Sequence, residues 1–335
     1  MASDDEKGKR LVDPQALARL KGVALRARAV VDGVLQGLHK SPHQGASIEF
    51  AEHKEYTPGD EIKHIDWKAY GRLDRYYVKK FEHETNLQAF FVIDASASMG
   101  YAAELPWAKG KAAEQTLSKF DYAATLVTSL GWLLLRQQDA IGLVKFDERV
   151  TAVLPPRARA THLAAVTQAL EETRVSGGTD LEAALASMVE MSKKRGLVFV
   201  LSDFFGDAER PFKMLRNLVG RGHDATVFHV LDGDELTFPF REMTLFEGME
   251  STQKLLVEPE IVRREYLARM DAHRAAIRQA AIDAQAGYQL ADTREPPGEL
   301  IRRFLRERKH GGITASAHAG VAGRGGRAQG AGGRD

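Results

Sequence analysis

The stretch Gln88–Ser98 (QAFFVIDASAS) decides the fold class. It begins as a nearly continuous apolar run that ends in an acid, which is typical of a strand buried on both faces of a parallel sheet. Two serines, Ser96 and Ser98, follow at once. Two later runs have the same apolar character, Gly196–Ser202 (GLVFVLS) and Ala225–Leu231 (ATVFHVL). The sequence therefore predicts several buried strands.

Amphipathic segments of helical length lie between these runs. The predicted helices are Phe120–Gln137, Thr161–Glu172, Asp180–Lys194, Ala208–Arg221, Glu258–Ala286 and Gly298–Lys309. Further strands are predicted at Ala140–Phe146, Arg149–Leu154 and Tyr288–Ala291. Strands alternating with helices indicate an α/β fold with a mostly parallel central sheet. Because such crossovers are right-handed, helices should cover both faces of the sheet.

The two ends of the chain depart from this pattern. Residues 1–12 are polar, and Asp13-Pro14 is predicted to open an amphipathic helix that runs to about Gly37. An irregular segment with one strand, Tyr76–Phe81, follows and is expected to pack with that helix on the sheet. Residues Gly311–Asp335 are mostly Gly, Ala, Arg and Ser and are predicted to be disordered. We therefore expect disordered ends at 1–12 and 311–335, an N-terminal segment at 13–87, and the α/β domain with a C-terminal helical extension at 88–310.

Composition narrows the class of protein. Lys and Arg number 47 and Asp and Glu 46, so bulk charge does not favour nucleic acid as a partner. Cysteine is absent, which excludes disulfides and thiolate metal sites. No apolar run approaches the ~20 residues that a membrane span requires. These features predict a cytoplasmic protein without a membrane span.

Polar side chains follow two of the predicted strands and one predicted loop. Asp94, Ser96 and Ser98 come directly after the first buried strand, Asp203 follows the second, and Thr179 follows a glycine pair in a loop before a helix. Ligands of open α/β sheets gather at the carboxyl ends of the strands. Two carboxylates and three hydroxyls form an all-oxygen set that suits Mg²⁺, Mn²⁺ or Ca²⁺. The alternative for these residues is a role in turns and helix caps only.

The ordered combination of Asp-x-Ser-x-Ser, Gly-Gly-Thr-Asp and strand-Ser-Asp resembles the metal-ion-dependent adhesion site of von Willebrand factor A domains. The resemblance covers about Gln88 to Leu231 and implies a Rossmann-like fold of that family. It places Asp94, Ser96, Ser98, Thr179 and Asp203 at the metal. One position on such a metal accepts a carboxylate, so the implied partner is a protein that presents an acidic residue.

The segment from about Gly45 to Glu84 resembles the prokaryotic "domain of unknown function 58" family. The residues that carry this resemblance are Glu49-Phe50, Glu55-Tyr56, Pro58-Gly59-Asp60, Ile65-Asp66-Trp67 and Tyr77-Val78-Lys79. It implies association with a MoxR-type AAA+ ATPase, in an adaptor or chaperone-accessory role. We expect Asp60, Asp66 and Trp67 to be structural, with a second functional surface as the alternative.

An enzyme is the competing hypothesis. Asp94 after a buried strand is also the arrangement of phosphatases that form an aspartyl-phosphate. Such enzymes need a second acid two residues on, and this position is Ser96. The sequence identifies no lysine or histidine at the strand ends as a substitute. We therefore predict no catalytic residues and a metal-dependent binding module, with a metal-dependent hydrolase using Asp94 as the alternative.

Overall fold

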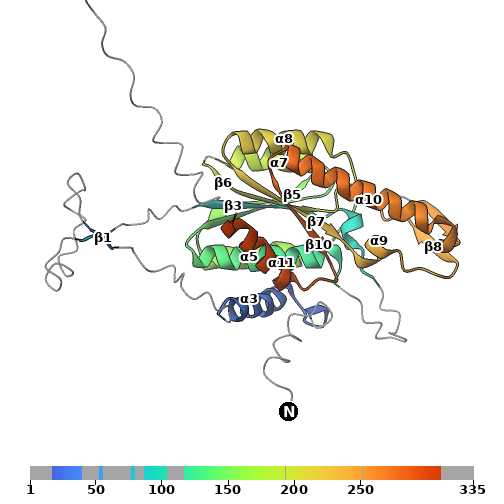
Figure 1. Cartoon of the computed structure of the whole chain (residues 1–335), viewed down its shortest axis with the longest axis horizontal. Helices are drawn as coiled ribbons and strands as arrows, with labels where there is room; N and C mark the ends of the chain where they lie inside the picture. Colours follow the sequence, from blue (N-terminus) through green and yellow to red (C-terminus); the bar gives the residue numbers. More distant parts are fainter. Residues whose placement is uncertain are drawn as a thin grey trace, which may run out of the picture.

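The computed structural model describes residues 17–39, 53–55, 77–79, 87–103, 117–192, 194–250 and 252–310. A six-stranded sheet with helices on both faces forms the centre of this part of the chain (Figure 1). The strand order is β10-β7-β6-β3-β4-β5. The predicted α/β fold with a mostly parallel central sheet is thus confirmed.

Strand β3 lies inside the sheet, between β6 and β4. It runs parallel to both, and within this six-stranded sheet the antiparallel pair is β4 with β5. The six strands are β3 (Gln88–Asp94), β4 (Ala140–Phe146), β5 (Val150–Arg157), β6 (Gly196–Ser202), β7 (Asp224–Leu231) and β10 (Gly287–Asp292). Because β3 and β6 are neighbours, the loops after Asp94 and Ser202 leave the sheet side by side.

Each face of the sheet has its own hydrophobic cluster. Phe91 and Ile93 pack into one cluster and Phe90 and Val92 into the other, because successive side chains of a strand point to opposite faces. The first face is covered by α5 (Lys119–Arg136), α6 (Ala160–Glu171) and α11 (Pro297–His310). Helix α3 (Val23–His39), which was expected to pack on the sheet, packs instead on the outer side of these helices. The second is covered by α7 (Leu181–Met191), α8 (Glu209–Gly220) and α10 (Pro259–Asp283) (Figure 1). Burial on both faces explains why the strand runs were continuously apolar.

The predicted N-terminal helix is interrupted. The apolar spacing indicated one helix from Asp13 to about Gly37, but the described chain is helical at Leu17 and Ala18, leaves the helix, and resumes as α3 at Val23. Gly22 has φ +91°, a left-handed conformation that interrupts a helix. The backbone N–H of Ala24 then donates to the Glu171 carboxylate of α6 at 3.3 Å. The interruption therefore anchors the start of α3 to its neighbour.

Several short elements were not predicted. They are η2 (Ala97–Gly100), α9 (Gly233–Thr237), and the antiparallel hairpin of β8 (Thr244–Glu247) and β9 (Lys254–Val257). Within the predicted strand Tyr76–Phe81, the described residues form β2 (Tyr77–Lys79), which pairs with β1 (His53–Glu55). The expectations for residues 1–12, Asp13-Pro14, Asp60, Asp66, Trp67 and 311–335 lie outside the described residues. In the described part, no helix has the length and apolar character needed to cross a bilayer.

Each edge strand of the central sheet has a feature that interrupts its outer row of backbone groups. Pro155 and Pro156, near the end of edge strand β5, have no N–H to donate. On the opposite edge, the Arg303 guanidinium donates to the Leu290 carbonyl oxygen of β10 at 3.0 Å. Both edge strands are therefore modified in ways that discourage pairing with a further strand.

Candidate functional site

Asp94 is the centre of a buried polar cluster at the carboxyl ends of β3 and β6. Its side chain is fully buried. One carboxylate oxygen, Oδ1, accepts from the Ser96 backbone N–H at 2.9 Å. The other, Oδ2, accepts from the Thr179 hydroxyl at 3.0 Å and the Ser202 hydroxyl at 2.6 Å. The sequence placed Asp94, Ser96 and Thr179 here but did not single out Ser202, whose signal was its position as the last residue of a buried strand.

The hydroxyls of Ser96 and Ser98 lie beside this carboxylate. Their Oγ atoms are 3.2 Å apart, and Ser96 precedes the 3-10 helix η2. Two backbone hydrogen bonds tie this loop to the glycine loop: Ala97 N donates to the Gly177 carbonyl oxygen, and Ser176 N donates to that of Ala95. These bonds join the loop that carries Ser96 and Ser98 to the loop that carries Thr179.

A glutamate from the β4–β5 turn shapes the Gly177-Gly178 loop. Gly177 has φ +71°, and a Cβ added there would lie 3.1 Å from the Glu148 carboxylate. That carboxylate accepts from the Gly178 backbone N–H at 3.0 Å. A left-handed backbone and a close carboxylate together require glycine at position 177. The loop then delivers Thr179 to Asp94.

Asp203 lies next to Asp94 but has a different set of partners. Its Oδ2 forms an ion pair of 2.8 Å with Lys119, the first residue of α5, and its Oδ1 accepts from Phe205 N at 3.1 Å. Lys119 also pairs with Glu235 of α9 at 2.6 Å. Lys119 and Asp203 are almost completely buried. Burial alone would lower the pKa of Lys119, but the two carboxylates outweigh it and raise that pKa above its usual value.

This ion pair corrects the sequence analysis, which identified no lysine or histidine at the strand ends. Two histidines are also present. The Nε2 atoms of His229 and His273 lie 3.0 Å and 3.2 Å from the Asp203 carbonyl oxygen, so both rings donate to it. Burial, assisted by the charge of His273, lowers the pKa of His229 to about 3. His229 is therefore neutral, and its Nδ1 accepts from the Tyr288 hydroxyl at 3.0 Å.

The cluster has an excess of negative charge. Asp94, Asp203 and Glu235 contribute three carboxylates and Lys119 a single ammonium group. Burial and the nearby charge of Asp203 raise the pKa of Asp94 from its ordinary value of 3.8 to about 6. At neutral pH the ionised Asp94 is consequently in an unfavourable environment, which a bound cation would relieve.

The spacing of the oxygen atoms is compatible with a small hard cation. Neighbouring ligands of an octahedral Mg²⁺, at about 2.1 Å from the ion, lie roughly 3 Å from each other. The Thr179–Asp94 and Ser96–Ser98 oxygen pairs are separated by 3.0 Å and 3.2 Å. Asp203 is less available to an ion than these groups, because its Oδ2 atom already accepts a hydrogen bond from the Lys119 ammonium group. In the described residues no three His, Cys, Asp or Glu side chains cluster as a metal site, so any ion here relies on hydroxyls.

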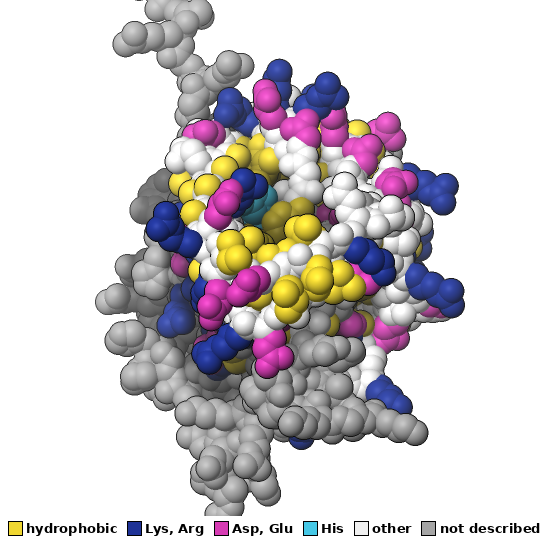
Figure 2. All heavy atoms as spheres, turned by 90° about the vertical axis from the view of Figure 1, so that its right-hand side faces the viewer, with side chains coloured by type: hydrophobic (Ala, Val, Ile, Leu, Met, Phe, Trp, Pro, Cys, Tyr) yellow, Lys and Arg dark blue, Asp and Glu magenta, His cyan; other side chains and the backbone are white. Residues whose placement is uncertain are grey.

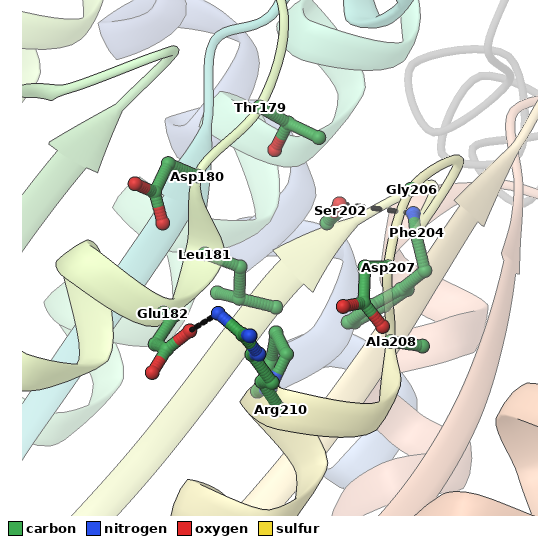
Figure 3. A pocket seen from close by; sticks show the side chains of 11 residues that line it. Thr179, Asp180, Leu181, Glu182, Ser202, Phe204, Gly206, Asp207, Ala208 and Arg210 are labelled. Carbon is green, nitrogen blue, oxygen red and sulfur yellow. Dashed lines mark hydrogen bonds and ion pairs between the residues drawn. The ribbon is translucent and has the colours of Figure 1, made fainter.

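A hollow opens beside the cluster. It has a volume of about 230 Å³, and Thr179 and Ser202 are part of its wall. Figure 3 shows Arg210 of α8 reaching across it toward Glu182 of α7, with Thr179 at the far side. The Arg210–Glu182 separation is 3.9 Å and both side chains are exposed, so this pair is weak. A ligand group can therefore approach Thr179 from solvent.

Comparisons with known proteins place the chain in a family. The chain is 24% identical to the uncharacterized protein Rv1480 of Mycobacterium tuberculosis (strain ATCC 25618 / H37Rv), over 90% of this chain and 92% of that protein. A solved structure of conserved hypothetical protein BatB from Bacteroides thetaiotaomicron is similar at 12% identity and a TM-score of 0.40, covering 67% of this chain and 99% of that one. The SpRpn10 VWA domain is similar at 9% identity and a TM-score of 0.37, covering 65% and 94%.

The model of the family described as "Protein of unknown function DUF58" matches residues 52–276. This range includes the cluster around Asp94 and Asp203, the glycine loop before Thr179, and the helix α5 that supplies Lys119. The match covers more than half of the chain. The chain belongs to the DUF58 family.

Proposed function

We propose that this protein is a non-enzymatic, metal-dependent protein-binding module. The observation that carries the proposal is the oxygen cluster around Asp94, where a fully buried carboxylate contacts the Thr179 and Ser202 hydroxyls beside the Ser96–Ser98 pair. Asp94, Ser96, Ser98 and Thr179 would hold Mg²⁺, or Mn²⁺ or Ca²⁺, and Asp203 would act from the second layer while bound to Lys119. The ion would supply a position for an incoming carboxylate.

The charge balance supports this assignment. Three carboxylates against one ammonium leave a net negative cluster, and the raised pKa of Asp94 reflects it. A divalent cation would neutralise that excess and leave no repulsion toward an acidic side chain of a partner. Thr179 is only partly buried and lines the solvent-facing hollow, so a partner would reach the ion from that side. The partner class is thus a protein with an exposed Asp or Glu.

We propose a MoxR-type AAA+ ATPase, or a protein that it remodels, as this partner, on the family resemblance. The test is recovery of an AAA+ ATPase from native lysate, with Mg²⁺ and with EDTA, by wild-type protein and by Thr179→Ala. We expect recovery only by the wild type in Mg²⁺, because Thr179 contributes one hydroxyl ligand. The fold should lose about 1–2 kcal/mol at most. Equal recovery in all four conditions would rule out the metal as the link.

The effect of metal should depend on pH. A protonated carboxyl is a poor metal ligand, and the pKa of Asp94 is raised to about 6. We therefore expect the Mg²⁺-induced rise in Tm to be complete above about pH 7 and to fade as the pH drops through 6. Thermal unfolding with and without Mg²⁺, in buffers from about pH 5 to pH 8, measures this. A rise in Tm that does not change across that range would argue against Asp94 as a ligand.

One observation favours the hydrolase alternative: a lysine, Lys119, binds Asp203, the carboxylate beside Asp94. However, the Lys119 ammonium is held by two carboxylates and is fully buried, so it cannot contact a substrate phosphate. Position 96 remains a serine, which cannot act as general acid. We expect no hydrolysis of p-nitrophenyl phosphate above background with Mg²⁺ or Mn²⁺. Turnover that disappears in Asp94→Asn would establish the enzyme instead.

A further inference from the structure

The hairpin β8–β9 carries an exposed apolar surface at the same end of the molecule as the cluster around Asp94. Five large aliphatic side chains on or beside it are 46% to 64% exposed, which we call the apolar strip: Met243, Leu245, Met249, Leu255 and Leu256. Figure 2 faces this end of the molecule and shows hydrophobic side chains gathered around a hollow in which a histidine is visible. Large apolar side chains gathered in this way at one end of a molecule are typical of an interaction site.

The hairpin that carries the strip is packed against a cluster of aromatic side chains, which we call the aromatic base. Phe238, at the end of α9, packs against Tyr266 of α10 with ring centroids 4.5 Å apart and against Phe246 of β8 at 5.6 Å. Phe240 closes the group at 5.2 Å from Phe238. Arg263 of α10 donates to the Phe238 carbonyl oxygen. The exposure of the strip is therefore not a consequence of a loosely attached hairpin.

The register of the hairpin separates its two faces. Leu245 pairs with Leu256, and Phe246 pairs with Leu255. Directly paired residues of an antiparallel ladder share a face, and successive residues alternate. Because Phe246 faces the aromatic base, Leu245 and Leu256 form a cross-strand apolar pair on the opposite, outward face, whereas Leu255 lies on the same face as Phe246.

The strip reaches the loops of the candidate metal site. A Cβ added to Gly100, two residues after Ser98, would lie 3.6 Å from Met249 Cε and 2.7 Å from Val175 of the glycine loop. The elements beneath are also connected. The Tyr101 hydroxyl donates to Asp234 of α9 at 3.0 Å, and Glu235 of the same helix holds Lys119. The tip of the hairpin is thus part of the rim of the site.

We propose that the apolar strip and the cluster around Asp94 form one docking surface, whose occupant is a protein segment that carries a carboxylate flanked by aliphatic side chains. The inference rests on the proposed function and specifies its partner. The cluster, once it holds a divalent ion, requires an anionic group, and the strip beside it requires apolar ones. The charged pair Glu247–Lys254 lies on the same outward face, between the leucine pair and Met249, and is internally neutralised. A carboxylate alone would leave the outward leucines in water.

The test uses the full chain and fluorescein-labelled peptides. The probe peptide has one aspartate with two leucines on each side. One control peptide has asparagine in place of the aspartate, and another has serines in place of the leucines. Binding is measured by fluorescence anisotropy in Mg²⁺ and in EDTA, with wild type and Leu245→Ser/Leu256→Ser. The matched control variant is Ile282→Ser, because Ile282 is 54% exposed but lies at the far end of α10.

We expect the wild type in Mg²⁺ to bind the leucine-flanked aspartate peptide about tenfold more tightly than the serine-flanked one. The double variant should lose this preference, and Ile282→Ser should keep it. Retained dependence on aspartate and Mg²⁺, without any preference for leucine, would overturn the docking surface and leave the proposed function standing. Equal binding of the aspartate and asparagine peptides in Mg²⁺ and EDTA would instead contradict the proposed function. If the double variant changes only the self-association of the chain, measured by sedimentation, the strip is an interface between copies and the proposal fails.

Discussion

Lys119→Met should lower the free energy of unfolding by about 3–5 kcal/mol, since it removes the cation between two buried carboxylates. Lys119 pairs with Asp203 at 2.8 Å and with Glu235 at 2.6 Å, and its side chain is inaccessible to solvent. Methionine fills a similar volume, so the loss comes from unpaired charge and not from a cavity. The measurement is urea unfolding at neutral pH, together with Tm, which should fall by roughly 10 °C.

Two controls isolate the charge. Arg269→Met removes the cation of an exposed pair with Glu265 on α10 and should cost less than about 1 kcal/mol. Combining Lys119→Met with Asp203→Asn and Glu235→Gln should recover part of the lost stability, because the neutral side chains no longer need a cation. If Lys119→Met is as stable as Arg269→Met, the buried ion pairs of Lys119 do not stabilise the fold.

Asp94→Asn is expected to have opposite effects without and with metal. The pKa of Asp94 is raised from 3.8 to about 6 by burial and by Asp203, so the ionised form costs stability above pH 6 and this cost disappears as the pH falls toward 4. In EDTA at about pH 8, Asp94→Asn should therefore be more stable than the wild type, by less than the roughly 3 kcal/mol that a shift of two pH units represents, because an amide nitrogen cannot accept from the Thr179 and Ser202 hydroxyls. With Mg²⁺ at a hundred times its Kd, the wild type should gain about 2.7 kcal/mol, and the variant should gain nothing.

Asp139→Asn is the matched control. Burial also raises the pKa of Asp139 to about 6, and this residue accepts from the Leu87 backbone N–H at 3.1 Å, at the opposite end of β3 from Asp94. Its variant should be stabilised in EDTA but should keep the full response to Mg²⁺. The site at Asp94 is disproved if both variants respond to Mg²⁺ like the wild type.

The sequence predicted the sheet and much of the cluster because both depend on local signals. A strand buried on both faces needs a continuous apolar run, and β3, β6 and β7 each have one. Polar residues directly after such runs must lie at the carboxyl edge of the sheet, so Asp94 and Asp203 could be placed together. The metal itself, its identity and the ATPase partner stay predictions.

Other features could not be predicted because they depend on tertiary contacts. Lys119 opens an amphipathic helix, a position where lysine is ordinarily solvated, and only the packing of α5 brings its ammonium to Asp203, 84 residues later in the chain. The strands β8 and β9 are short and have no clear apolar alternation. The break before α3 was missed because the apolar spacing continues through Gly22, whose left-handed backbone has no signal in that spacing.

The modified sheet edges have a consequence for behaviour at high concentration. An open edge strand is a template on which another chain can add its own strand, and repeated addition builds fibrils. Pro155 and Pro156 interrupt this template on β5, and Arg303 occupies a carbonyl oxygen on β10. At high concentration these two features work against the addition of a further strand, and so against cross-β aggregation through the edges of the central sheet.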